Sequence, residues 1–168
     1  YSSPLGKITL ASNGNELIGL WFEGQKYFGS TLNGEYKQKS LPVFEQTAKW
    51  LDIYFSGKNP DFTPPLFLSS TSFRNEVWKI LLTIPYGKIM TYGEIAKLMA
   101  ENRGVEKMSA RSVGGAVGHN PISIIVPCHR VVGTDGSLTG YAGGVDIKEK
   151  LLKFENVDMS KLFVPKSK

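Results

Sequence analysis

Cysteine is almost absent from this chain, since Cys128 is the only one among 168 residues. A single cysteine excludes an internal disulfide, and the presence of only two histidines argues against a zinc site of Cys and His ligands. No apolar run approaches the ~18 residues of a membrane-spanning helix, and no charged-then-apolar signal segment opens the sequence. We therefore expect a cytoplasmic protein that uses no metal and no membrane segment.

Charge of one sign is in modest excess and unevenly placed. The net charge is +5, and residues 1–70 contribute none of it because six lysines balance six acidic residues. Residues 71–168 carry 14 Lys and Arg against nine Asp and Glu. A basic half suggests a polyanionic partner, although a solvated basic face explains the same excess.

The first third of the chain predicts a small antiparallel sheet with a helix. Residues 7–11 alternate, an Asn-Gly turn follows, and residues 17–22 complete a hairpin. Residues 43–56 predict a helix that Gly57 ends. Its apolar face is expected at Phe44, Ala48, Leu51 and Phe55. Nothing in residues 1–68 indicates a functional site, so we interpret this domain as a scaffold.

A second, mainly helical domain is expected at 69–160, after a proline-rich linker and before a tail at 161–168. Thr71 is a plausible N-cap for its first helix, and Thr91 with Glu94 forms a capping-box pattern for the next. The first helix is expected to bury Phe73, Val77, Ile80, Leu81 and Ile84. The second is expected to bury Ile95, Leu98 and Met99.

A third helix is predicted at 109–117, and it is unusual because it contains Gly114 and Gly115. Each glycine inside a helix costs about 1 kcal/mol relative to alanine. Small residues permit close approach, either of another helix within the protein or of nucleic acid. With the helix before it, and with Arg111 near its start, this segment is a helix-turn-helix candidate.

The apolar run 122–126 predicts a buried strand that Pro127 ends. Cys128 follows, with His129 and Arg130 beside it. A thiolate is the nucleophilic form of cysteine, and a neighbouring base or cation favours it. A lone cysteine is often an inert small hydrophobe, but these neighbours favour a reactive thiol.

The remainder of the domain predicts supporting elements. Residues 131–132 and the turn 134–136 predict a second strand or hairpin, and the loop 140–144 is a candidate pocket wall. Asp146 is expected to cap a last helix, whose inward face is Ile147, Leu151 and Leu152. Glu155 lies near the end of that helix, where a carboxylate is mildly unfavourable. This is consistent with a role elsewhere.

The segment Pro127–Val131 resembles the active-site signature of the O6-alkylguanine-DNA alkyltransferases, also called methylated-DNA–protein-cysteine methyltransferases, of bacterial type. Five further blocks carry the resemblance in order: 73–78, 86–94, 111–116, 120–121 and 140–144. The N-terminal third resembles the family more loosely, through 3–6 and 19–22. The chain departs from the common pattern in a longer charged loop at 101–109, in Ser112 and in Lys150.

The resemblance implies an α+β fold, with a ribonuclease H-like N-terminal domain and a winged helix-turn-helix-like C-terminal domain that carries the cysteine. It implies DNA repair by a single irreversible transfer of a methyl or other alkyl group from guanine O6, and from thymine O4, to Cys128. The implied partner is double-stranded DNA containing O6-alkylguanine, bound through the minor groove by a monomer. No cofactor is implied.

The resemblance also assigns roles to residues. Cys128 is the nucleophile, His129 takes its proton through a water, Glu155 orients the histidine, Asn120 braces the turn, and Tyr92 donates to guanine N3. Arg111 fills the space left by the flipped nucleotide. The other substrate or DNA contacts fall on Thr91, Ser112, Gly114, Gly115, Arg130, Val131, Tyr141 and Ala142.

Two other classes of function remain open on the sequence. A Cys–His hydrolase or acyltransferase needs an oxyanion hole, for which Gly143 and Gly144 are the only candidate donors. A non-catalytic helix-turn-helix protein that binds lesions is the other class, and the presence of Cys128 argues against it.

Overall fold

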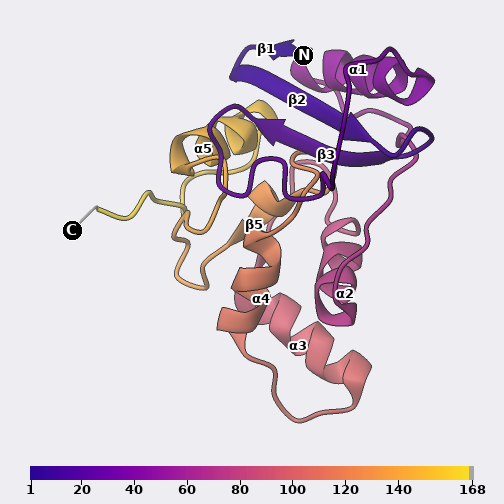
Figure 1. The fold of residues 1–168 in the computed structure, drawn as a ribbon. Coiled ribbons are helices and arrows are strands. Elements are labelled where there is room, and N and C mark those ends of the chain that lie inside the picture. Colours follow the sequence, from indigo (N-terminus) through magenta and orange to yellow (C-terminus); the bar gives the residue numbers. More distant parts are fainter. Residues whose placement is uncertain (167–168) are drawn as a thin grey trace.

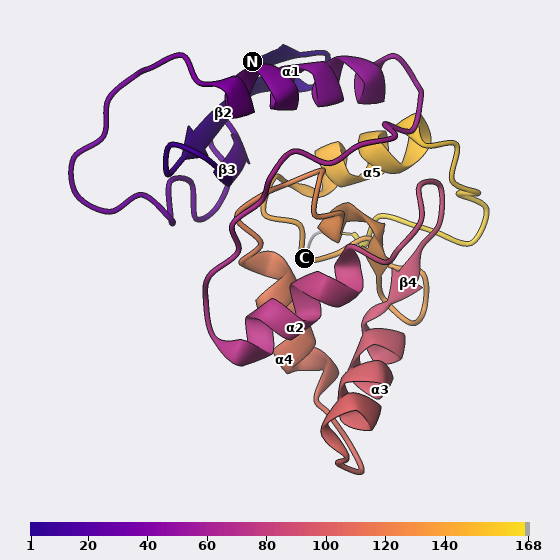
Figure 2. The ribbon, with the colours of Figure 1, turned by 90° about the vertical axis from the view of Figure 1, so that its right-hand side faces the viewer.

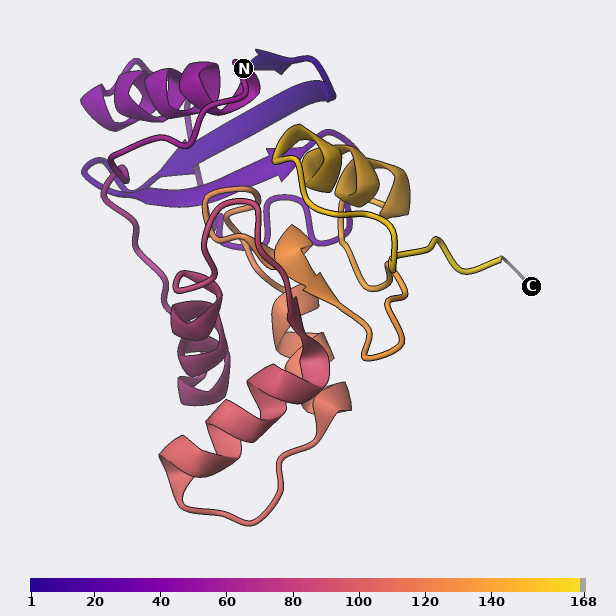
Figure 3. The ribbon, with the colours of Figure 1, turned by 180° about the vertical axis from the view of Figure 1, so that it is seen from behind.

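The computed structural model describes residues 1–166 as an α+β protein. Its N-terminal half contains the antiparallel sheet β1 (Ser2–Ser3), β2 (Gly6–Ser12) and β3 (Leu17–Phe22), followed by α1 (Pro42–Phe55). Figures 1 and 3 show α1 on one side of the sheet and the remaining helices on the other. Those later elements are α2 (Ser72–Leu81), β4 (Met90–Thr91), α3 (Tyr92–Arg103), α4 (Ala110–Gly118), the 3-10 turn η1 (Cys128–Arg130), β5 (Val131–Val132) and α5 (Val145–Phe154).

The predicted hairpin is confirmed. The pairing of β2 with β3 runs from Ile8 opposite Phe22 to Ser12 opposite Leu17, with an irregularity near its closed end. The Asn13 side-chain oxygen closes the loop by accepting from the backbone N–H of Asn15 at 3.1 Å and of Glu16 at 2.8 Å. Figure 2 shows the long connection from β3 to α1 extending away from the helices.

Helix α1 is also confirmed, but its buried face is rotated from the predicted one. The residues expected to face the core at the two ends, Phe44 and Phe55, are only partly buried. The buried side chains are Val43, Thr47, Trp50, Leu51 and Tyr54. The sequence therefore placed Tyr54 outside the core face, which matters for the site below.

The two halves join along the free edge of β3. Leu17 N–H donates to Pro65 O at 2.8 Å, and Leu20 N–H donates to Pro121 O at 2.9 Å. Ser123 N–H returns a bond to Leu20 O at 3.0 Å. Buried side chains from both halves form one continuous apolar cluster. The segment that leads to Cys128 is therefore anchored on the N-terminal sheet.

Local capping signals correctly placed the first three helices of the second half, α2, α3 and α4. The Thr71 hydroxyl caps α2, and the Thr91–Glu94 capping box opens α3. The Ser109 hydroxyl accepts from Ser112 N–H at 3.2 Å and caps α4. One predicted core residue is wrong, because Leu98 is 37% exposed. Helix α3 instead buries Ile95, Ala96, Met99 and Ala100.

The predicted strand at 122–126 is wrong, although its burial is confirmed. The backbone turns here, with Ile124 at φ 71°. The Asn120 amide spans the turn by donating to Val126 O at 2.7 Å and accepting from Ile122 N–H at 3.0 Å. These local bonds satisfy backbone groups that a strand ladder would otherwise pair.

The C-terminal elements also differ from expectation. Gly144 precedes α5 with φ 97°, and Asp146 lies in the first turn without capping it. Val131–Val132 is a strand, but it pairs in parallel with β4 rather than in a hairpin. The expected tail is bonded to the domain at Phe163, because Leu138 N–H donates to Phe163 O at 2.8 Å and Phe163 N–H to Gly136 O at 3.1 Å. Its residues 167–168 lie outside the described part of the chain.

Candidate active site

Cys128 lies at the start of η1, at the end of the turn that Asn120 braces. Only 5% of the residue is exposed. Burial raises the pKa of its thiol, while an Asn120 hydrogen bond and the Lys148 charge partly oppose that rise. The resting sulfur is therefore a protonated thiol near neutral pH, and its reaction requires a base.

His129, the next residue in the sequence, is the candidate for that base. The side chain is fully buried, and its Nε2 lies 2.5 Å from Glu155 Oε2. Because a carboxylate only accepts, this contact assigns the proton to Nε2 and leaves Nδ1 unprotonated. Nδ1 has no hydrogen-bond partner among residues 1–166. Burial lowers the pKa of His129, although Glu155 opposes the change, so the neutral imidazole is the resting form.

Glu155 follows the last residue of α5 and is itself buried. Its Oε1 accepts from Arg130 Nε at 2.8 Å and from Gly87 N–H at 3.0 Å. Burial alone would raise the pKa of this carboxyl, but His129 and Arg130 outweigh it and lower the pKa to about 2. The permanent charge of Arg130 supports this direction whether or not His129 is protonated.

Arg130 makes its contacts inside the protein. Its Nη1 donates to Ile84 O at 2.7 Å, and the residue is buried. The guanidinium also lies 5.8 Å from the centre of the Tyr86 ring. The structure thus places Arg130 behind Glu155, although the family resemblance implied a substrate or DNA contact for it.

Tyr92 begins α3, and its hydroxyl donates to Thr139 O at 2.9 Å. Burial, with a smaller effect of Cys128, raises the pKa of Tyr92 to about 12, so it remains a proton donor. The same carbonyl accepts from Lys148 Nζ at 2.8 Å. Lys148 is fully enclosed on α5, and burial lowers its pKa to about 8. Sequence reasoning missed this lysine, because a charged residue on a helix is normally solvated.

The outer face of α4 is small and open. Arg111, Ser112 and Gly115 are exposed, and Gly114 is half-buried. A Cβ at Gly114 would lie 3.8 Å from the Tyr92 ring, an ordinary contact, and one at Gly115 would meet nothing within 4 Å. Tight packing inside the protein therefore does not explain Gly115.

A cavity of about 480 Å³ opens beside this face of α4. The loop after Thr139 forms its other wall, with Tyr141 buried and Ala142 half-buried. The N-terminal half also reaches it, because Lys26 N–H donates to Ala142 O at 3.1 Å. The Tyr27 ring stacks on His119 with 4.0 Å between centroids. The sequence gave no signal for Lys26 or Tyr27.

Two further predicted residues, Thr91 and Val131, stabilise the backbone around the site. Thr91 is half-buried at the N-cap of α3. Val131 is buried in β5, opposite Met90, and its N–H donates to Cys128 O. These contacts hold the carbonyl side of the cysteine segment against the start of α3, beside Tyr92.

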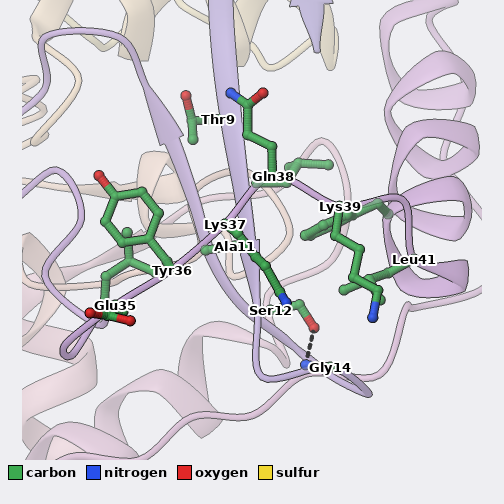
Figure 4. A pocket seen from close by; sticks show the side chains of 13 residues that line it. Thr9, Ala11, Ser12, Gly14, Glu35, Tyr36, Lys37, Gln38, Lys39 and Leu41 are labelled. Atoms are coloured by element: carbon green, nitrogen blue, oxygen red, sulfur yellow. Dashed lines mark hydrogen bonds between the residues drawn. The ribbon is translucent and has the colours of Figure 1, made fainter.

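A second cavity, of about 490 Å³, lies between β2 and the connection to α1 (Figure 4). Its lining includes Tyr36, Lys37 and Lys39 but no cysteine or histidine. The Cys128, His129 and Glu155 side chains do not line this cavity. Within residues 1–166, no cluster of His, Cys, Asp and Glu is arranged to hold a metal ion. No helix in this range is long and apolar enough to cross a membrane.

A buried thiol followed in sequence by a histidine that is paired with a carboxylate, in a domain with an open helix face, is typical of a cysteine-dependent group-transfer protein. Two family models match the sequence: the DNA-binding domain of 6-O-methylguanine DNA methyltransferase at residues 72–157 and its ribonuclease-like domain at 1–68. The chain belongs to this family, whose members repair DNA directly by transferring the alkyl group to a cysteine.

Curated relatives match along most of their length. The methylated-DNA–protein-cysteine methyltransferase of Methanosarcina barkeri is 46% identical over 154 residues, covering 91% of this chain and 92% of the relative. The Haemophilus influenzae protein of the same name is 39% identical over 158 residues, covering 94% and 84%. The crystal structure of Mycobacterium tuberculosis OGT in complex with DNA is 41% identical, with a TM-score of 0.80 and coverage of 96% and 92%. The predicted fold class and enzyme class are confirmed.

Proposed function

We propose that this protein repairs O6-alkylguanine in duplex DNA by moving the alkyl group to Cys128, and that O4-alkylthymine reacts by the same displacement. The observation that carries the proposal is the position of the chain's only thiol. It lies in a buried turn and is followed by His129 of the histidine–glutamate pair, and Tyr141, which lies near Cys128, lines the cavity beside α4.

The thiol proton passes to His129 Nδ1 through a water, and the sulfur attacks the alkyl carbon. A carbon–sulfur bond forms while the carbon–O6 bond breaks, and its electron pair stays on the guanine. Tyr92 supplies a proton at N3, so the base leaves neutral. The imidazolium then restores the phenol through solvent, and the net change exchanges an alkyl group for a proton. The thioether is stable, so each molecule reacts once and no cofactor is needed.

Positioning residues prepare this step. Asn120 holds the cysteine turn, and Glu155 fixes the histidine tautomer. Arg130 supports Glu155 from behind, a role that its two buried contacts favour over binding DNA. Tyr92 must exchange its bond to Thr139 O for one to the substrate, and Lys148 can keep that carbonyl paired when it does.

We place the DNA against the exposed face of α4, in its minor groove, with the damaged nucleotide extruded into the adjacent cavity. Arg111 replaces the extruded base in the stack, and Ser112, Gly114 and Gly115 permit close approach of the backbone. Thr91, Val131, Tyr141 and Ala142 border the extruded base. We divide the chain into domains at 1–68 and 69–160, and propose a monomer in the reducing cytoplasm, which keeps Cys128 as a thiol.

The test is to incubate the protein with duplex DNA containing O6-methylguanine and weigh it. We expect a gain of one methyl group per molecule and no turnover beyond one equivalent. Cys128→Ser is the matched control, and it should bind DNA without gaining mass, because a hydroxyl is a far poorer nucleophile. Methyl transfer by the serine variant would refute the assignment of the nucleophile.

The same assay separates the alternatives. Multiple turnovers without a mass gain would indicate a hydrolase. One of its candidate oxyanion donors is already occupied, because Gly144 N–H donates to Tyr141 O at 3.0 Å. Binding of the lesion without any transfer would indicate a non-catalytic lesion-binding protein.

A further inference from the structure

The carboxylate of Glu155 has a fourth donor, and it comes from the N-terminal half. The Tyr54 hydroxyl of α1 donates to Glu155 Oε2 at 2.7 Å, across 101 positions of sequence. This is the same oxygen that contacts His129 Nε2. The other two donors, Arg130 and Gly87, both use Oε1.

Tyr54 is held so firmly that this contact is a fixed part of the structure. The residue is fully buried. Its ring stacks on Trp50 at 5.4 Å between centroids and meets Tyr86 edge-on at 6.2 Å. Phenylalanine would fill the same apolar space, and a buried hydroxyl is unfavourable unless it is paired. Packing therefore explains the ring of Tyr54 but not its hydroxyl.

We propose that Tyr54 is a positioning residue for the alkyl transfer: it fixes Glu155 against His129 and shares the negative charge on the oxygen that His129 contacts. The inference rests on the proposed function of His129 as the base. It also makes the N-terminal domain, which we interpreted from the sequence as a scaffold, a contributor to the reaction centre.

Without the Tyr54 hydroxyl, His129 is the only one of these donors left on Glu155 Oε2. The imidazolium form then gains stability, so His129 should become more basic. The other groups that face this pair are unchanged: Arg130 and Gly87 on Glu155, Lys148 toward His129, and the Tyr86 phenol near Glu155. As the pH is lowered, the rate of transfer should therefore begin to fall at a higher pH than in the wild type, because a protonated His129 cannot accept the thiol proton.

The experiment compares Tyr54→Phe with wild type and with Tyr86→Phe. Tyr86 is the matched control, because its hydroxyl lies beside the same site but contacts Phe154 O at 3.4 Å rather than Glu155. Second-order rates with free O6-benzylguanine are measured from acid to alkaline pH. We expect the pH at which the rate falls to half on the acid side to rise by about half a unit or more in Tyr54→Phe. In Tyr86→Phe this midpoint should not change.

Two further measurements test the effect of Tyr54 on His129 independently of the transfer rate. NMR titration of the His129 ring reports its basicity without any transfer, so failure of the proposed function and failure of this inference remain distinct. Replacement of Tyr54 by 3-fluorotyrosine, a stronger donor, retains the fold and should move the rate midpoint and the titration in the opposite direction. Unchanged His129 titration in both variants would overturn the proposal.

Discussion

Gly115 offers a test in which stability and function should move in opposite directions. It lies inside α4 at a helical, negative φ, and its exposed side is open. Alanine in its place adds a methyl group that meets no atom within 4 Å. The helix gains about 0.5–1 kcal/mol, because glycine loses more backbone freedom on folding than alanine does. For a chain of this size, that gain raises the melting temperature by about 1–4 °C.

The same methyl group should weaken binding to DNA. If the DNA backbone lies against this face, a Cβ at Gly115 occupies contact space, and overpacking of that kind typically costs about 1–3 kcal/mol. The expected loss of affinity is therefore about fivefold to a hundredfold, since 1.4 kcal/mol corresponds to a factor of ten. Reaction with free O6-benzylguanine should be unaffected, because no DNA is bound in that assay.

The assays are thermal denaturation, duplex binding by fluorescence anisotropy and the rate with the free base. Asn102→Ala is the matched control, because it improves helix propensity on the exposed surface of α3 beside Glu76 and Lys79 of α2. The control should gain stability and retain full affinity. A Gly115→Ala protein that is more stable and binds duplex as tightly as wild type would refute the placement of DNA on α4.

Arg111→Ala should slow repair of duplex DNA much more than reaction with free O6-benzylguanine, whereas Tyr92→Phe should slow both; equal losses on both substrates for Arg111→Ala would make that residue structural. Full methylation of Cys128, which is 5% exposed, should lower the melting temperature by several degrees, because an added carbon overpacks a buried site by about 1–3 kcal/mol; an unchanged value would contradict this. Because the pKa of Glu155 falls from 4.5 to about 2 on folding, its ionised form contributes up to about 3 kcal/mol above pH 4.5, and this is lost as pH falls toward 2; urea unfolding across this range should show a loss that Glu155→Gln reduces.

Sequence reasoning succeeded where a few neighbouring residues determine the structure. The starts of α2, α3 and α4 each depend on one hydroxyl and the next turn of backbone, so Thr71, Thr91 and Ser109 were sufficient. The prediction of Cys128 and His129 as reactive residues likewise rests on neighbouring residues in the sequence.

Sequence reasoning failed where a residue's position depends on a partner far away in the sequence. It also failed where a side chain makes the hydrogen bonds that a neighbouring strand would otherwise make. The run 122–126 is apolar enough for a strand, but the Asn120 amide turns it. Tyr54 and Glu155 are separated by 101 positions, and no periodicity links them. Lys148 is a further case, because its burial depends on Thr139 supplying a carbonyl at 2.8 Å.

A protonated resting thiol suits a protein molecule that can react only once. A permanently ionised cysteine would be consumed by any passing oxidant or electrophile, and each such event would remove a whole protein molecule. Burial of Cys128 raises its pKa, and Arg130, the nearest permanent cation in sequence, is committed to Glu155 instead of the sulfur. In the proposed mechanism, the proton leaves through neutral His129 once a substrate carbon lies against the sulfur. This arrangement needs a base whose proton affinity is tuned, and the donors on Glu155, including Tyr54 from the other half of the chain, are the groups that can set it.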